Sequence, residues 1–132
     1  MISIELSKLL KYVNLSEEYE PMLEQILQMA KCKTLFNQER LVIPADIHSK
    51  TNLISILNLN SVGEVTAVFK KFITAELCTY LAKEKLYVLD PLKFGIREWY
   101  KDGELQLSYL EYNRFVLTNK NSHIQLIIAY ND

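Results

Sequence analysis

Polar and cationic side chains gather on one side of a short segment in the middle of the chain. Apolar residues recur there at helical spacing around Val65, which predicts an amphipathic helix over residues 61–73. The side chains left for solvent or a ligand are Ser61, Gly63, Glu64, Thr66, Ala67, Lys70, Lys71 and Thr74. A small, polar face with lysines near its end suits insertion into the major groove of duplex DNA. The alternative is an ordinary solvated helix face.

A β-hairpin is predicted directly after this helix. Residues 77–81 and 86–89 are β-prone runs, and a polar tip separates them. Lys83 and Lys85 lie in that tip, where they would contact phosphates without reading bases. A helix that leads into a hairpin with lysines at its tip is typical of a winged helix-turn-helix.

Residue patterns that indicate catalysis or metal binding are missing from the sequence. The two histidines, His48 and His123, belong to no metal-binding motif, and Cys32 and Cys78 form no metal or disulfide framework. Three glycines are too few for a phosphate-binding loop. We therefore predict a protein that is not an enzyme and that has no cofactor and no metal.

Two helices are predicted ahead of the central segment. The first covers residues 3–13, and a break at 14–16 separates it from the second. Pro21 fits the first turn of the second helix, and Lys31 and Lys33 suit its C-terminal end. The pair would supply core packing or, alternatively, a dimer surface.

Residues 35–40 are predicted to be a polar connection into a strand over residues 41–43. Pro44 suits the first turn of a helix over residues 45–57, whose apolar stripe includes Ile47. Poor helix formers in its middle predict a break near Lys50.

The last third of the chain is predicted to be β-structure. An Asp-Gly turn at 102–103 lies between β-prone runs at 96–100 and 104–112, and a further apolar strand is expected at 124–130. Aromatic residues gather here: Phe94, Trp99, Tyr100, Tyr109, Tyr112 and Phe115. They would either join these strands to the helices or stack on single-stranded bases.

Length and composition indicate one α+β domain of 132 residues, a winged helix-turn-helix at 41–91 between N-terminal helices at 1–34 and a β-rich extension at 92–132. With 49% hydrophobic and 23% charged residues, the chain reads as an ordinary globular protein. We find no bilayer-spanning apolar run and no cationic leader, which predicts a cytoplasmic protein without membrane contact. The net charge of −1 argues against a protein that coats DNA, but not against a sequence-specific binder.

Residues 58–112 resemble the RepL-type replication initiators of small Gram-positive plasmids and related phage proteins. The similarity lies in the helix VGEVTAVFKKFITAEL, in the wing that closes as KLYVLDPLKFG, and in the following WYKDGELQLSYLEYN. The chain departs from the family pattern in Asp90, where Asn is usual, in a longer approach to the charged turn, and in the acidic Glu64. The resemblance implies a DNA-binding module for replication or transcription of a mobile element.

Two classes of function remain open from the sequence. In the first, the chain is a sequence-specific protein that binds double-stranded DNA through helix 61–73 and wing 77–89. In the second, the same fold is a protein-interaction adaptor that a phage could encode, without direct DNA contact. Besides duplex DNA, a homodimer or a host or phage protein is a further partner that the sequence allows. The near-neutral net charge favours the second class.

Overall fold

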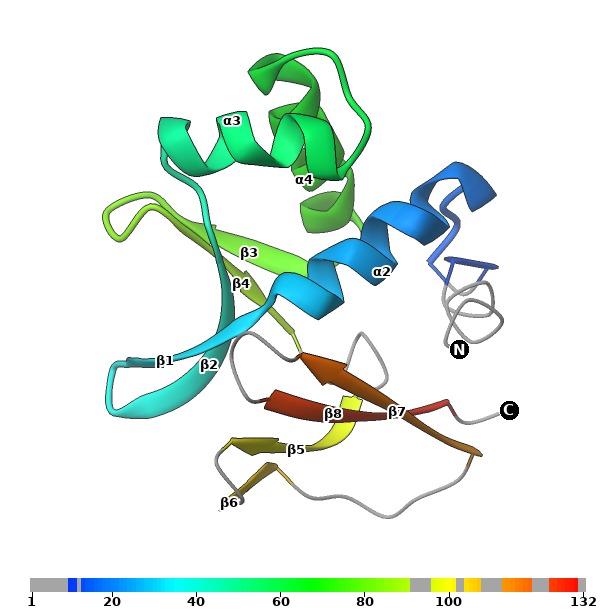
Figure 1. The fold of residues 1–132 in the computed structure, drawn as a ribbon, viewed down its shortest axis with the longest axis vertical. Coiled ribbons are helices and arrows are strands. Elements are labelled where there is room, and N and C mark those ends of the chain that lie inside the picture. Colours follow the sequence, from blue (N-terminus) through cyan, green and yellow to red (C-terminus); the bar gives the residue numbers. More distant parts are fainter. Residues whose placement is uncertain are drawn as a thin grey trace.

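The computed structural model describes the backbone of residues 10–11, 13–90, 96–101, 104–107, 113–119 and 124–130, and the side chains of residues 10–11 and 13–90. The elements run in the order η1 (Glu17–Tyr19), α2 (Glu20–Met29), β1 (Lys31–Leu35), β2 (Gln38–Pro44), α3 (Ile47–Ile56), α4 (Val62–Thr74), β3 (Cys78–Leu81), β4 (Leu86–Leu89), β5 (Ile96–Lys101), β6 (Glu104–Leu107), β7 (Asn113–Asn119) and β8 (Ile124–Tyr130). This is the predicted α+β composition (Figure 1).

The described strands form two antiparallel sheets of four strands each. The first has the order β1-β2-β4-β3, and the second has the order β6-β5-β8-β7. In Figure 1, α3 and α4 lie above the first sheet, α2 crosses the middle of the view, and the second sheet lies below α2. Helix α2 contributes to the core beside the first sheet and also contacts strand β7.

The main core fills the space between the three helices and one face of the first sheet. Cross-strand pairing of Ile43 with Tyr87 places both side chains on that face. The largest fully buried side chains of the described residues are Phe69, Phe72, Leu10, Leu23, Ile26, Leu27, Leu41, Ile43, Leu53 and Leu77. Burial of Phe69 and Phe72 confirms the predicted inner face of the central helix.

Helix α2 confirms part of the N-terminal prediction and corrects another part. Pro21 lies in the first turn, as expected, and Leu23 and Ile26 are buried. The helix ends at Met29, because Ala30 adopts an extended backbone with ψ of 137°. The predicted position of Lys31 and Lys33 at the helix end is therefore wrong, and so is a helical boundary at residue 34. These residues belong to β1.

Strands β1 and β2 form a hairpin where a polar connection over residues 35–40 was predicted. Five cross-strand pairs join them, from Lys31 opposite Val42 to Leu35 opposite Gln38. Phe36 and Asn37 form the turn with φ of 51° and 65°, the positive values that a two-residue type I′ turn requires. The predicted strand 41–43 is thus longer, and Pro44 ends β2 instead of starting α3.

Helix α3 begins after Asp46, whose carboxylate accepts hydrogen bonds from the Ser49 backbone N–H at 3.1 Å and from Ser49 Oγ at 2.6 Å. These bonds hold the pKa of the Asp46 carboxyl below its usual value. The helix continues through Lys50, so the predicted break there is wrong. Ile47 is 69% exposed and does not join the apolar stripe, because the first helical turn places it away from the core.

The C-terminal strands confirm the predicted β-structure in outline. Strands β5 and β6 pair up to Lys101 opposite Glu104, as the Asp-Gly hairpin predicts, and β8 covers the predicted strand 124–130. Strand β7 was not predicted as a separate strand. The predicted helix residues 3–9, the turns at 102–103 and 120–122, and the side chains of the C-terminal aromatic residues lie outside what the structure describes.

Candidate functional site

The start of α4 is fixed by reciprocal capping bonds. Ser61 Oγ accepts from the Glu64 backbone N–H at 3.2 Å. The Glu64 carboxylate accepts from the Asn60 backbone N–H at 2.8 Å and from Asn60 Nδ2 at 3.3 Å. This resembles a capping box, in which a carboxylate satisfies free N–H groups near the positive end of the helix dipole. Glu64 and Ser61 were predicted to face a ligand; their polar atoms form these bonds at the helix start, and a ligand contact of the two residues stays a prediction.

The remaining predicted residues of α4 share one solvent-facing side. The exposed side chains are those of Gly63, Thr66, Ala67, Lys70, Lys71 and Thr74. Thr74 Oγ1 donates to the Lys70 carbonyl at 3.0 Å, so its hydroxyl is used within the helix. Lys70 and Lys71 extend their ammonium groups at the C-terminal half of this face, where they complement the negative end of the helix dipole.

Lys50 of α3 lies beside the same face of α4, although it was not among the predicted site residues. Its Nζ donates to Thr66 Oγ1 of α4 at 3.1 Å and lies 5.7 Å from the centroid of the Tyr87 ring in β4. One cation thereby connects two helices and the first sheet. No sequence spacing indicates this contact, because Lys50 and Thr66 are brought together only when α3 packs on α4.

An aromatic stack joins α4 to the β3–β4 hairpin. The rings of Phe69 and Tyr87 have centroids 4.0 Å apart and an interplanar angle of 4°. The ring centroid of Tyr80 in β3 lies 5.3 Å from that of Tyr87. The Tyr80 side chain is 44% exposed, so the aromatic cluster ends at the surface. Burial, with a smaller effect of Tyr80, raises the pKa of Tyr87 to about 12. The Tyr87 hydroxyl therefore stays protonated at neutral pH.

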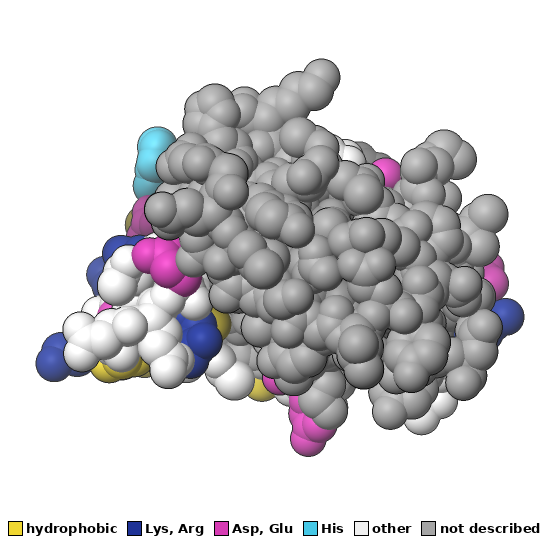
Figure 2. Space-filling view, turned by 90° about the horizontal axis from the view of Figure 1, so that it is seen from below, with side chains coloured by type: hydrophobic (Ala, Val, Ile, Leu, Met, Phe, Trp, Pro, Cys, Tyr) yellow, Lys and Arg dark blue, Asp and Glu magenta, His cyan; other side chains and the backbone are white. Residues whose placement is uncertain are grey.

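The β3–β4 hairpin is the predicted wing, and Lys83 and Lys85 are exposed at its tip. Lys85 has a φ of 53°, and its carbonyl accepts from the Ala45 N–H at 2.9 Å. That bond ties the tip to the start of α3. Figure 2 shows basic, acidic and a few hydrophobic side chains side by side at the left end of the molecule, the end toward which the hairpins of the first sheet project in Figure 1.

Other chemistry finds little support in the described part of the chain. No group of three or more His, Cys, Asp or Glu residues within it is arranged to hold a metal ion. Burial raises the pKa of the Cys78 thiol to about 12, which makes it a poor nucleophile. Among the described helices, none has both the length and the apolar character that a membrane crossing requires. Comparison of the chain with protein families, curated proteins and solved structures gives no match.

Proposed function

We propose that the chain is a sequence-specific, cytoplasmic DNA-binding protein with a winged helix-turn-helix, acting in replication or transcription control of a phage or plasmid. Helix α4 enters the major groove, and the wing lies along the phosphate backbone. The protein works without a cofactor and is not an enzyme. The observation that carries this proposal is the exposed polar face of α4, with half-buried Lys50 bound to Thr66 on it and exposed Lys83 and Lys85 at the tip of the hairpin that follows α4.

The topology of the first sheet supports the winged-helix part of the proposal. In a winged helix, the strand before the helix-turn-helix pairs with the second strand of the wing. Strand β2, which precedes α3, pairs here with β4, and β4 pairs with β3. The turn between α3 and α4 is short, and Asn58 at its start adopts a φ of 57°. Strand β1 is an addition at the outer edge of β2.

Charge on this surface supports an anionic partner despite the net charge of −1. Lys70 and Lys71 are exposed on α4, and Lys83 and Lys85 are exposed at the tip of the β3–β4 hairpin. The carboxylate of Glu64, the acid expected to oppose phosphate, is held by Asn60 at the helix start. Counterion release by a few such lysines is the usual source of salt-dependent DNA affinity.

A protein-interaction adaptor is the second candidate, and exposed apolar residues of α3 favour it. Ile47 is 69% exposed and Ile56 is 41% exposed. Apolar side chains at the surface of a helix are common in protein interfaces. In that case a host or phage protein, or a second copy of the chain, would cover α3, and duplex DNA would not bind.

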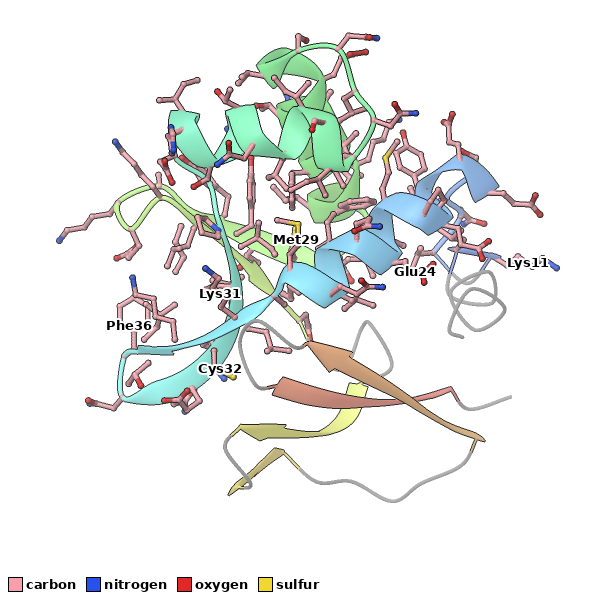
Figure 3. The ribbon with its side chains drawn as sticks, in the orientation of Figure 1. Lys11, Glu24, Met29, Lys31, Cys32 and Phe36 are labelled. Atoms are coloured by element: carbon pink, nitrogen blue, oxygen red, sulfur yellow. The ribbon has the colours of Figure 1, made fainter. Side chains whose placement is uncertain are left out.

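Matched charge reversals test the main proposal. Lys70→Glu and Lys11→Glu change the charge equally, and both positions are exposed. Figure 3 places Lys11 on the far side of the molecule from the wing. We expect Lys70→Glu to weaken binding to a random-sequence duplex by roughly tenfold at low salt, equivalent to about 1.4 kcal/mol. Equal affinities for the two variants would contradict a role of α4.

A further inference from the structure

The tip of the β1–β2 hairpin carries an aromatic residue in an unfavourable place. Phe36 is 77% exposed and adopts a φ of 51°. Left-handed backbone is uncommon for non-glycine residues and disfavoured for a bulky one, and glycine or asparagine is the usual choice in this turn. Phe36 therefore has two costs for the folded protein, an apolar ring in water and a strained backbone.

The same hairpin places like charges opposite one another. Lys33 pairs directly with Arg40, and Lys31 lies two residues along the same face. All three side chains are exposed, and Arg40 donates a hydrogen bond to the Gln38 side chain. Like charges at directly opposed positions of a sheet are destabilising. Glu39, the one acidic residue of the hairpin, accepts from Thr34 on the opposite face of the strand pair.

Unfavourable features that occur together at an exposed tip indicate a function performed by that tip. From them we infer that the β1–β2 hairpin is a second DNA contact, in which Phe36 inserts as a wedge between base pairs from the minor groove. Lys31, Lys33 and Arg40 neutralise the phosphates that flank the wedge. Proteins that bend DNA from the minor groove use apolar wedges of this kind, phenylalanine among them.

The hairpin and the wing can reach one duplex. Strand β2 pairs with both β1 and β4, so the two hairpins belong to one sheet. Its seven residues connect the β1–β2 turn to Pro44, which pairs with Leu86 beside the wing tip. At roughly 3.3 Å per residue, β2 spans about 23 Å between the bases of the two hairpins, less than one turn of B-DNA, which is about 34 Å. Figure 1 shows both tips at the same side of the molecule.

A membrane surface is the other partner that an exposed phenylalanine among cations suggests, and a second copy of the chain could pair along the edge strand β1. Exposed Lys31 and Lys33 on that strand oppose edge-to-edge pairing. We argue for DNA because this inference rests on the proposed function, which already supplies a polyanion at the neighbouring wing.

Two glycine substitutions in the turn distinguish the effect of the Phe36 ring from the effect of a glycine in the turn backbone. Phe36→Gly removes the ring, whereas Asn37→Gly leaves it, and glycine accepts the positive φ at both positions. The probe is a random-sequence duplex with a fluorescent adenine analogue in TA steps, which unstack easily. Wild type and Asn37→Gly should raise the fluorescence by unstacking the analogue. Phe36→Gly should not, and it should bind about tenfold more weakly, near the low end of the effect of an aromatic stacked on a base.

The outcomes distinguish the wedge from the proposed function. In one outcome, Phe36→Gly binds the duplex and unstacks the analogue like wild type while Lys70→Glu binds the duplex weakly. The proposed insertion of Phe36 would then be wrong, and the role of α4 would stand. If Phe36→Gly alone loses binding, the wedge stands and the role of α4 is wrong. If wild type binds no duplex, both are wrong. Binding to anionic phospholipid vesicles that Phe36→Gly abolishes, without duplex binding, would replace DNA by a membrane surface. A melting midpoint of Phe36→Gly at or above that of wild type is expected, since the strain is relieved.

Discussion

Phe69 and Tyr87 stack face to face, with ring centroids 4.0 Å apart, and so connect the centre of α4 to the second strand of the wing. Phe69 is fully buried and also meets Phe72 edge-on at 5.9 Å. This stack is one of the core contacts that fix the orientation of α4 relative to the β3–β4 hairpin.

Removal of the Phe69 ring should destabilise the protein strongly. Phe69→Ala is expected to lower the free energy of unfolding by about 3–5 kcal/mol, through lost burial and the cavity left between α4 and β4. Phe69→Leu should cost less, because it retains most of the apolar volume. Urea denaturation followed by circular dichroism measures both. An alanine variant as stable as wild type would show that the inner face of α4 is misassigned.

The cap of α4 should contribute a smaller, separable amount. Ser61→Ala removes the acceptor for the Glu64 N–H and is expected to cost about 1 kcal/mol, whereas Ser61→Gly should cost only a few tenths. Thermal melts of the two variants give the comparison. Equal melting points for Ser61→Ala and wild type would mean that Ser61 does not cap the helix in solution.

The two cysteines should differ in reactivity. Cys78 is buried with a thiol pKa of about 12, and Cys32 is half-buried in β1. A thiol-specific reagent at neutral pH should therefore label Cys32 first, and Cys78 only on unfolding, since the thiolate is the reacting form. Mass spectrometry of the labelled peptides gives the order. Rapid native labelling of Cys78 would argue against its position in the core.

Alkaline pH should destabilise the fold. The pKa values of Cys78 and Tyr87 rise from ordinary values of 9.0 and 10.0 to about 12, so both groups ionise more readily in the unfolded chain. Their contribution to stability is complete below pH 9 and is lost as the pH rises toward 12. Tyr87→Phe retains the ring and should show a smaller alkaline loss. An identical pH profile for that variant would contradict burial of the Tyr87 hydroxyl.

The sequence predicted α4 well because all the relevant information is local. Apolar spacing around Val65 fixes the inner face, and Ser61 provides the cap. Local information failed for β1, because Lys31 and Lys33 suit a helix end equally well, and Phe-Asn is an unusual hairpin turn. Asn37, which tolerates positive φ, was the available signal.

The contact of Lys50 with α4 could not be predicted from the sequence either. A lysine among polar helix residues has no pattern that identifies its partner, and the contact to Thr66 requires the packing of α3 on α4. The positions of Lys83 and Lys85 were predictable, since a polar tip between β-prone runs indicates a hairpin. Contact of these two lysines with DNA stays a prediction.

The wing lysines should position the protein without selecting a sequence. Lys83→Glu/Lys85→Glu is expected to weaken binding to cognate and random duplex by similar factors, so that the ratio of the two affinities stays nearly constant. The free energy of unfolding should change by less than about 0.5 kcal/mol, because both side chains are exposed. A selective loss of cognate binding would assign base contacts to the wing instead.

The salt dependence of duplex binding tests most directly whether the protein binds DNA through α4. Wild type and Lys70→Ala/Lys71→Ala are titrated with random-sequence duplex over a series of salt concentrations, after circular dichroism shows that both are folded. If α4 binds DNA, the wild-type affinity falls steeply with salt, and the slope of log affinity against log salt decreases by up to roughly two units in the variant. A wild-type dissociation constant weaker than about 10⁻⁴ M at physiological salt, or an unchanged slope in the variant, would contradict DNA binding through α4.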